Sequence, residues 1–266
     1  MSAESPPTLP SIVAFAPRER TRALVKAAFP RRKCRLLFAR TANDFATAFR
    51  AELVDAALVD VTSTHDDTWT IAALAREFPS APFFALASLR AAEGPALAQC
   101  VELEFADVVV EGIDDACARD MVCNRGFSAR FSDALRVPPS SLSLVTDVQR
   151  RAWAYIVAHA GRRVRTVSLA RRLGVTREHL SRTFAAEGAP NLKRVIDLVR
   201  LLAAAELAKN PGYDIRDVAS VLDFASSSHL SSTAQRIVGT KPASLARLRS
   251  IDLIQRFTRG HGRSRS

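Results

Sequence analysis

Hydrophobic residues in the first half of the chain form short unbroken runs, separated by longer stretches in which apolar positions recur at helical spacing. Such runs between amphipathic stretches predict buried parallel strands that alternate with helices. The predicted strands are residues 12–15, 35–39, 57–61, 83–87 and 107–110, and the predicted helices are 18–29, 43–52, 69–78, 95–104 and 114–135. Five strand–helix units predict a doubly wound α/β domain of flavodoxin-like order.

The second half of the chain shows only the helical pattern, and it contains one arrangement twice. Apolar residues recur at helical spacing over 169–173 until a break at Gly174, and again over 218–222 until a break at Asp223, 49 residues later. Another short helix follows each break, and each run has an alanine at its second position, which lets two helices cross closely. Two short helices joined by a tight turn form a helix-turn-helix, so the pattern predicts an all-α domain with two such units.

A longer helix is predicted between the two units, over residues 192–208. Its apolar stripe faces one side, while Lys193, Arg194, Asp197 and Arg200 share the other side. At three-residue spacing, Asp197 can pair with Arg194 and Arg200 along this helix. About 17 residues make a strut of roughly 25 Å. A rigid spacer of that size suits two units that read successive major grooves, which recur about every 34 Å on one face of a duplex.

Prolines and serines at 136–141 separate the two halves and predict a linker. A chain of 266 residues has room for about two domains. The predicted order is a disordered N-terminus (1–10), an α/β domain (11–135), a linker (136–146), a helical domain (147–257) and a basic tail (258–266).

Charge is divided unequally between the two halves. Residues 1–140 carry 16 Lys and Arg against 18 Asp and Glu, whereas residues 141–266 carry 22 against 9. The balances are therefore −2 and +13. A positive excess confined to one domain suits a polyanion partner, since phosphate neutralisation and counterion release supply most non-specific affinity for DNA. The charge favours double-stranded DNA as the partner.

Several other classes of protein are disfavoured. Cys34, Cys100, Cys117 and Cys123 form no C-x-x-C pair, so we expect no metal site, redox site or cofactor. The turn at 16–20 after the first predicted strand contains no glycine, which disfavours a nucleotide-binding enzyme, and no catalytic residue is predicted. The opening residues lack a signal sequence, and no apolar run reaches the roughly 18–20 residues of a membrane span. We therefore expect a cytoplasmic protein.

The helical half carries an ordered set of family motifs. They are Leu169-Ala170 with Leu173-Gly174, Leu180 to Phe184, Gly188, Arg200 with Ala204 and Leu207, Ile215, Val218-Ala219, Phe224, and Gly239 to Pro242. On these motifs, residues from about 150 to 249 resemble the DNA-binding domain of AraC/XylS-type bacterial transcription regulators. The resemblance implies a sequence-specific regulator whose two helix-turn-helix units enter successive major grooves, with RNA polymerase as a further candidate partner.

The second unit departs from the family pattern in its turn and on its second helix. Asp223 stands where the family usually has glycine, Leu230 and Ala234 stand for two phenylalanines, and Ser232 replaces a common arginine. These changes affect the ability of the second unit to read bases more than they affect its fold.

The α/β half ends its third predicted strand at Asp60. On this position it resembles the receiver domains of response regulators, in which that aspartate accepts a phosphoryl group. Ala14 and Phe15 replace the acidic pair that holds Mg²⁺, and Glu111-Gly112 stands at the position of the expected lysine. A carboxylate is hard to phosphorylate without a neutralising cation. We therefore expect a degenerate receiver that serves homodimerisation, partner binding or signal input. The alternatives are a response regulator switched at Asp60 and, third, an enzyme fused to a DNA-binding domain.

The candidate DNA contacts lie on the second helix of each unit. In the first unit they are Thr176, Arg177, Glu178, Ser181 and Arg182. Thr176 is a good N-cap, and the resemblance assigns base contacts to Glu178, Ser181 and Arg182. Glu178 and Arg182 are alternatively an i,i+4 ion pair on a solvated face. In the second unit the candidates are Ser226, Ser227, Ser228, His229 and Ser232, which we expect to position the protein more than to read bases.

Overall fold

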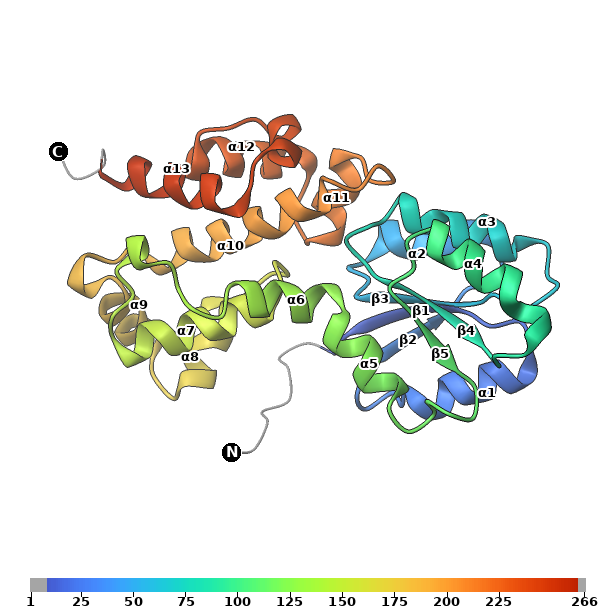
Figure 1. Ribbon diagram of the computed structural model, residues 1–266. Helices are drawn as coiled ribbons and strands as arrows, with labels where there is room; N and C mark the ends of the chain where they lie inside the picture. The colour runs from blue at the N-terminus through green and yellow to red at the C-terminus, as the bar shows by residue number, and fades with distance from the viewer. Residues whose placement is uncertain (1–8, 263–266) are drawn as a thin grey trace. The chain divides into compact units, whose positions relative to one another are not determined.

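The computed structural model describes residues 9–262, which divide into two compact units. The α/β unit comprises Leu9–Arg130 together with Asn210–Tyr213, and the helical unit comprises Phe131–Lys209 and the residues from Asp214 onward. Figure 1 shows the sheet of the first unit and the helices of the second. Residues 1–8 of the predicted N-terminal segment and 263–266 of the predicted tail lie outside the described residues.

The α/β unit is built on one parallel sheet. Its strands are β1 (Ser11–Phe15), β2 (Arg35–Phe38), β3 (Ala56–Asp60), β4 (Phe83–Ala87) and β5 (Asp107–Val110). They are arranged in the order β2-β1-β3-β4-β5, with every pairing parallel, and Val13 of β1 lies opposite both Leu37 of β2 and Ala57 of β3. The flavodoxin-like prediction is therefore confirmed. The strands are apolar on both faces because helices cover both faces.

Helices cover the two faces of this sheet unequally (Figure 1). Helices α1 (Glu19–Ala28) and α5 (Ala118–Arg125) pack on one face, and α2 (Ala42–Ala51), α3 (Asp67–Ala73) and α4 (Gly94–Glu102) pack on the other. Alternate residues of each strand serve the two cores, so Ile12 faces α1 and α5 while Val13 faces α2 to α4. A stack of Phe49, Phe78 and Phe83 fills the second core.

The long helix predicted over 114–135 is instead two helices, α5 and α6 (Phe127–Ala134), which meet at Gly126. The buried Asp55 causes the break. Its backbone oxygen accepts a hydrogen bond from Phe127 N, and its side-chain Oδ1 accepts one from Ser128 N. A Cβ at Gly126 would lie 3.3 Å from the Asp55 Cβ, so the close approach favours glycine. Periodicity predicted the helical content correctly but could not reveal this contact.

The segment Asn210–Tyr213 packs within the α/β unit although it is distant in sequence. The Asn210 Oδ1 accepts a hydrogen bond from Ser80 N at 2.8 Å. The Tyr213 hydroxyl donates to the backbone oxygen of Phe49 at 3.1 Å, and its ring meets the Phe78 ring edge-on with centroids 4.9 Å apart. The sequence had suggested only a helix-ending turn at this segment.

The helical unit follows α6 with seven helices within the described residues. They are α7 (Asp147–Ala158), α8 (Thr166–Leu173), α9 (Arg177–Phe184), α10 (Leu192–Leu207), α11 (Ile215–Val221), α12 (Ser227–Val238) and α13 (Ser250–Gly262). Short 3₁₀ turns occur at Leu74–Arg76, Ala91–Glu93, Ser140–Leu142, Ala186–Gly188 and Pro242–Arg247. The last helix continues past Phe257, where we had expected it to end. None of the helices in residues 9–262 is both long and apolar enough to cross a membrane.

The central helix of this unit is α10, which agrees with the helix predicted over 192–208, but its polar side is buried at Asp197 and Arg200. Residues 195–205 of this helix are all buried, Asp197 and Arg200 included. Helices α7, α11, α12 and α13 all pack against it, so most of its circumference is covered. Asp197 does not form the expected ion pairs along its own helix, because it pairs with Arg236 of α12 instead.

Candidate nucleic-acid interface

The two predicted helix-turn-helix units share one turn geometry. Gly174 after α8 has a φ of 70°, and Asp223 after α11 has a φ of 54°. Two backbone hydrogen bonds close each turn, and the second pair lies 49 residues after the first. They are Val175 N to Ala170 O and Gly174 N to Arg171 O, then Phe224 N to Ala219 O and Asp223 N to Ser220 O. The repeated layout therefore extends to the backbone hydrogen bonds.

The second helix of each unit begins with a hydroxyl cap. The Thr176 hydroxyl oxygen accepts from His179 N, and the Ser226 hydroxyl oxygen accepts from His229 N, each at 3.1 Å. The second turn is one residue longer, because Thr176 comes two residues after Gly174 while Ser226 comes three after its counterpart. Both hydroxyls are engaged as caps, which leaves the exposed N–H groups of each first turn for a phosphate.

Helix α9 exposes the side chains that the sequence predicts as DNA contacts of the first unit. Leu180 and Phe184 are fully buried. The candidate contacts of this unit are all exposed, namely Thr176, Arg177, Glu178, Ser181 and Arg182. Within residues 9–262, no ion pair joins Glu178 to Arg182. The alternative in which these two side chains satisfy each other is therefore not the arrangement found.

A buried glutamine fixes the end of α9, and sequence reasoning missed it. The Gln149 side chain of α7 donates through Nε2 to Phe184 O at 2.9 Å and to Ala186 O at 3.1 Å. Gln149 also forms a capping box with Thr146. That T-x-x-Q spacing is readable from the sequence, but the contact with a carbonyl 35 residues away is not.

Helix α12 presents a different surface, which is uncharged over its first turns and carries Arg236 in its last turn. Leu230 and Ala234 are buried, while Ser226, Ser228, His229 and Ser232 are exposed and Ser227 is half-buried. The Ser232 hydroxyl donates to His229 O at 3.1 Å, and the neighbouring Ser231 hydroxyl donates to Ser227 O at 2.9 Å. Because each of these hydroxyls donates its proton to a backbone oxygen of the same helix, it can still accept a hydrogen bond from another group but has no proton left to donate. The His229 ring lies edge-on to Phe224, with centroids 5.7 Å apart.

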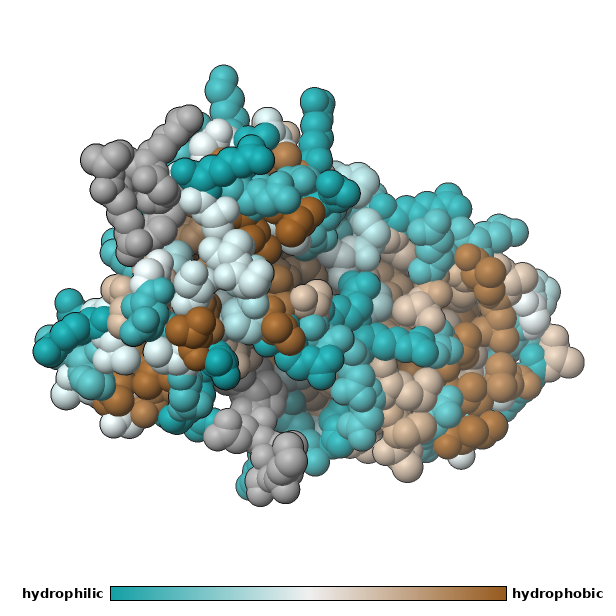
Figure 2. Space-filling view, turned by 60° about the vertical axis from the view of Figure 1, so that its left-hand side comes forward, coloured by the Kyte–Doolittle hydropathy of each residue, from teal (hydrophilic) through white to brown (hydrophobic). Residues whose placement is uncertain are grey.

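Cations gather around the first unit and not around the second. Residues 162–182 contain seven arginines and one acidic residue, and six of those arginines are exposed. Residues 214–238 contain two arginines and three aspartates. The balances are therefore +6 and −1. Figure 2 shows hydrophilic side chains standing out from the helical unit. The first helix-turn-helix segment is thus more basic than the second.

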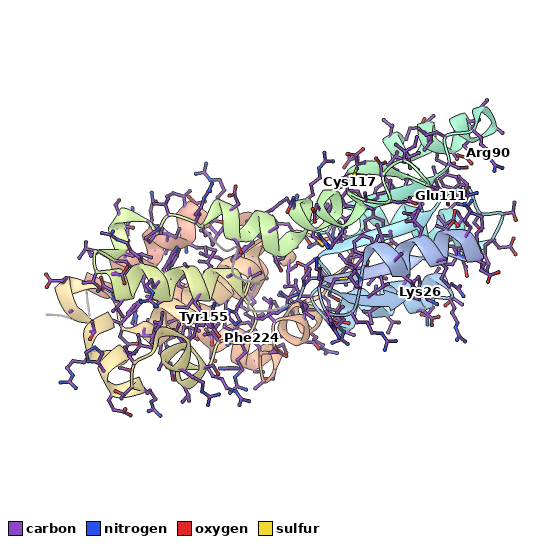
Figure 3. The ribbon with its side chains drawn as sticks, turned by 90° about the horizontal axis from the view of Figure 1, so that it is seen from below. Lys26, Arg90, Glu111, Cys117, Tyr155 and Phe224 are labelled. Atoms are coloured by element: carbon purple, nitrogen blue, oxygen red, sulfur yellow. The ribbon has the colours of Figure 1, made fainter. Side chains whose placement is uncertain are left out.

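A second charged cluster lies at the end of the sheet in the α/β unit. Asp60, at the end of β3, is 0% exposed, and Arg18 holds both of its oxygens. Arg18 Nε donates to Oδ1 at 3.0 Å and to Oδ2 at 2.8 Å, and Nη2 donates to Oδ1 at 2.7 Å. The same Nη2 donates to Glu111 Oε1 at 2.6 Å. Glu111, the residue directly after β5, is labelled in Figure 3. Two buried carboxylates therefore share one guanidinium.

Neighbouring groups complete this cluster. The Thr21 hydroxyl donates to Glu111 Oε1 at 2.6 Å, and the Ser88 hydroxyl after β4 donates to Glu93 Oε1 at 2.6 Å. Partial burial lowers the pKa of Arg18, but its hydrogen bonds with Asp60 and the charges of Asp60 and Glu111 outweigh burial and leave this pKa raised. Sequence reasoning placed Arg18 only at the start of a helix. Glu111 stands where the receiver resemblance predicts a lysine, and this acidic residue was the sequence signal that the cation beside Asp60 comes from another position.

Comparisons with known proteins agree with the helical unit. Residues 169–247 match the model of a family described as a helix-turn-helix domain. None of the curated proteins matches the chain. A crystal structure of full-length FixJ from B. japonicum is 11% identical and superposes with a TM-score of 0.39, covering 86% of this chain and 97% of that chain. At that score the likeness adds nothing to the fold, which the strand order defines. The chain therefore carries a helix-turn-helix domain in its C-terminal half, after an α/β unit with the flavodoxin-like strand order.

Proposed function

We propose that this protein is a sequence-specific, DNA-binding transcription regulator, and that its two recognition helices, α9 and α12, enter successive major grooves. The observation that carries the proposal is the duplicated helix-turn-helix, with the same turn hydrogen bonds 49 residues apart, in the cationic half of the chain. Both recognition helices keep exposed polar residues. A duplicated helix-turn-helix in a basic segment fits the binding of duplex DNA better than the binding of a small ligand.

The two helix-turn-helix units, here called the first head and the second head, contribute unequally to DNA recognition in this proposal. We propose that Arg182 bonds guanine through two of its N–H donors, that Glu178 accepts from cytosine N4, and that Ser181 contacts a neighbouring base. Thr176 and Arg177 contact phosphates at the start of α9. On α12, Ser226, Ser227, Ser228, His229 and Ser232 offer neutral hydrogen bonds, which position the protein and discriminate weakly between bases. The charge balances of +6 and −1 support this division.

The α/β unit acts as a receiver-like domain without phosphoryl transfer. Both oxygens of Asp60 accept hydrogen bonds from Arg18, and Arg18 occupies the position of a neutralising cation. A phosphoryl group would have to displace an internal ion pair and recruit Mg²⁺ beside that guanidinium. We propose that the unit serves homodimerisation or the binding of a partner such as RNA polymerase, that the protein works in the cytoplasm, and that it catalyses no reaction.

Selection of bound sequences from a random duplex pool tests the DNA proposal. The full-length protein is expected to enrich a site with one sharply defined half, read by α9, and one loosely defined half. Enrichment without any common sequence would contradict sequence-specific binding. Replacing Arg182 by alanine should then relax the preference at one base position, by about 1–3 kcal/mol. Equal weakening on selected and scrambled DNA would mean that Arg182 contacts only phosphate.

Incubation with acetyl phosphate and Mg²⁺, followed by intact-mass measurement, tests the role of Asp60. No phosphorylated species is expected, because the carboxylate is buried and paired. A phosphoryl group localised to Asp60 would establish the alternative, a phosphorylation-switched response regulator.

A further inference from the structure

Two charged side chains lie buried on α10, where apolar residues of similar volume would avoid the cost of desolvation. Asp197 is 8% exposed and Arg200 is 7% exposed. Buried charges are weak sources of stability, and their better-attested use is to fix one arrangement of the chain against others. Both side chains reach the second helix-turn-helix, at two separate places.

Arg200 holds the turn between α11 and α12. Its Nη2 donates to Leu222 O at 2.8 Å, and its guanidinium carbon lies 3.8 Å from the centroid of the Phe224 ring. Phe224 is buried and is labelled among the helices of this unit in Figure 3. Arg200 therefore contacts the residues on both sides of Asp223. Burial lowers the pKa of Arg200, and the charges of Asp197 and Asp223 oppose that shift.

The turn that Arg200 contacts needs support. Asp223 has the left-handed backbone that Gly174 adopts in the first unit, and a residue with a Cβ pays roughly 1–2 kcal/mol for it, with aspartate among the more tolerant residues. The Leu222 carbonyl closes no helical bond at this end of α11, so the guanidinium supplies its partner. Arg200 thus stabilises the conformation that sets the angle between α11 and α12.

Asp197 holds the other end of the recognition helix. Its Oδ2 accepts from Arg236 Nη2 at 2.8 Å, and Arg236 lies in the last turn of α12. The central helix α10 is therefore attached to α12 through a polar contact before its first turn and another in its last turn. The first recognition helix is held by a different device, Gln149 of α7. Loss of the α10 contacts should therefore affect only the second head.

We infer that Arg200 and Asp197 are positioning residues for α12, and that they fix the alignment of the second head, whose first turns are uncharged, on its half of the DNA site. This inference rests on the proposed function. Neutral hydroxyl contacts are short-ranged and directional, so a head that contacts DNA through hydroxyls depends on alignment more than a strongly basic head does. The buried charges of α10 supply that alignment.

The test uses full-length protein and three duplexes: the selected site, a site with the α9 half scrambled, and a site with the α12 half scrambled. Affinities are measured by fluorescence anisotropy at one salt concentration. Wild-type protein should lose affinity on both scrambled sites, whereas Arg200→Met should lose discrimination only between the selected site and the site scrambled in its α12 half. Failure of the wild type to distinguish any duplex would refute the proposed function itself.

Arg194→Met is the matched control. Arg194 lies on the same helix and also sits over an aromatic ring, 5.4 Å from the Phe257 centroid, but that ring belongs to α13. This control should keep discrimination at both halves. Phe224→Leu preserves an apolar side chain while it removes the ring beneath Arg200, and it should reproduce Arg200→Met. It therefore decides the question if Arg200→Met fails to fold. Equal loss at both halves, or no loss at either, would overturn the inference.

A double-mutant cycle separates positioning from direct contact at Arg236. Asp197→Asn and Arg236→Gln should each weaken discrimination at the α12 half, and the double variant should be no worse than the poorer single variant. A direct bond from Arg236 to a phosphate would give a different result, because Arg236→Gln would keep its full effect in the Asp197→Asn background. That outcome would remove Asp197 from the proposed role.

Discussion

Replacing Arg18 by methionine removes the one cation that Asp60 and Glu111 share and keeps most of the side-chain volume. The two carboxylates have side-chain exposures of 0% and 2%, so water cannot readily take over from the guanidinium. Removing one partner of a buried ion pair typically costs about 3–5 kcal/mol, because the other charge is left uncompensated.

The expected loss is smaller than that upper range. Arg18 itself is 32% exposed, so its interactions are partly screened by solvent. We therefore expect the α/β unit to lose about 2–4 kcal/mol. For a unit of this size, a loss in the middle of that range corresponds to a fall in melting temperature of roughly 10 °C.

The two tryptophans allow the assay to resolve the units, because Trp69 lies in the α/β unit and Trp153 in the helical unit. Unfolding is followed by fluorescence in the native sequence and in a Trp69→Phe background, which leaves only Trp153 as the reporter. Arg18→Met should lower the transition seen through Trp69 and leave the one seen through Trp153. Arg20→Met, whose guanidinium is 75% exposed, serves as the control and should cost at most about 1 kcal/mol. If the α/β unit of Arg18→Met has the same melting temperature as that of the wild type, the guanidinium does not stabilise the strand ends.

Three further predictions concern the helical unit. Gly174→Ala should destabilise the helical unit by about 1 kcal/mol, from left-handed backbone strain alone, because an added Cβ meets nothing within 4 Å. Chemical denaturation followed by Trp153 fluorescence should show this loss of stability, and an unchanged denaturation midpoint would contradict the prediction. Burial lowers the pKa of His159 below 6.5, so the contribution of His159 to stability is complete above pH 6.5 and is lost as the pH falls through the folded-state pKa. His159→Gln should therefore make the melting temperature depend less on pH between pH 7 and pH 5. An unchanged pH dependence would exclude His159 as its cause. Arg177→Ala should weaken binding to selected and scrambled duplexes alike and reduce the salt slope of log K by about one, whereas a sequence-dependent loss in titrations at several salt concentrations would assign Arg177 to base reading.

The elements that were predictable from the sequence are those whose cause is local. Short apolar runs determined the strands, because a strand buried on both faces needs no polar alternation. The break at Gly174 and its counterpart at Asp223 located both turns. Their shared hydrogen bonds follow from backbone geometry that adjacent residues set.

What sequence reasoning missed depends on contacts between distant residues. Arg18 meets Asp60 and Glu111 across separations of 42 and 93 residues, and only the folded sheet brings their strand ends together. The polar side of α10 illustrates a second limit. Periodicity separates two faces of a helix and places Asp197 and Arg200 opposite the apolar stripe, but it does not reveal that other helices cover that face and bury both residues.

Hydroxyl-radical footprinting of the full-length protein on its selected duplex tests the two-headed DNA reading most directly. Two protected segments should appear on one face of the duplex, about one helical turn apart, and protection of the segment facing α9 should depend more steeply on salt because the first helix-turn-helix is the more basic of the two. A single protected segment, or protection spread evenly along the duplex, would contradict the account.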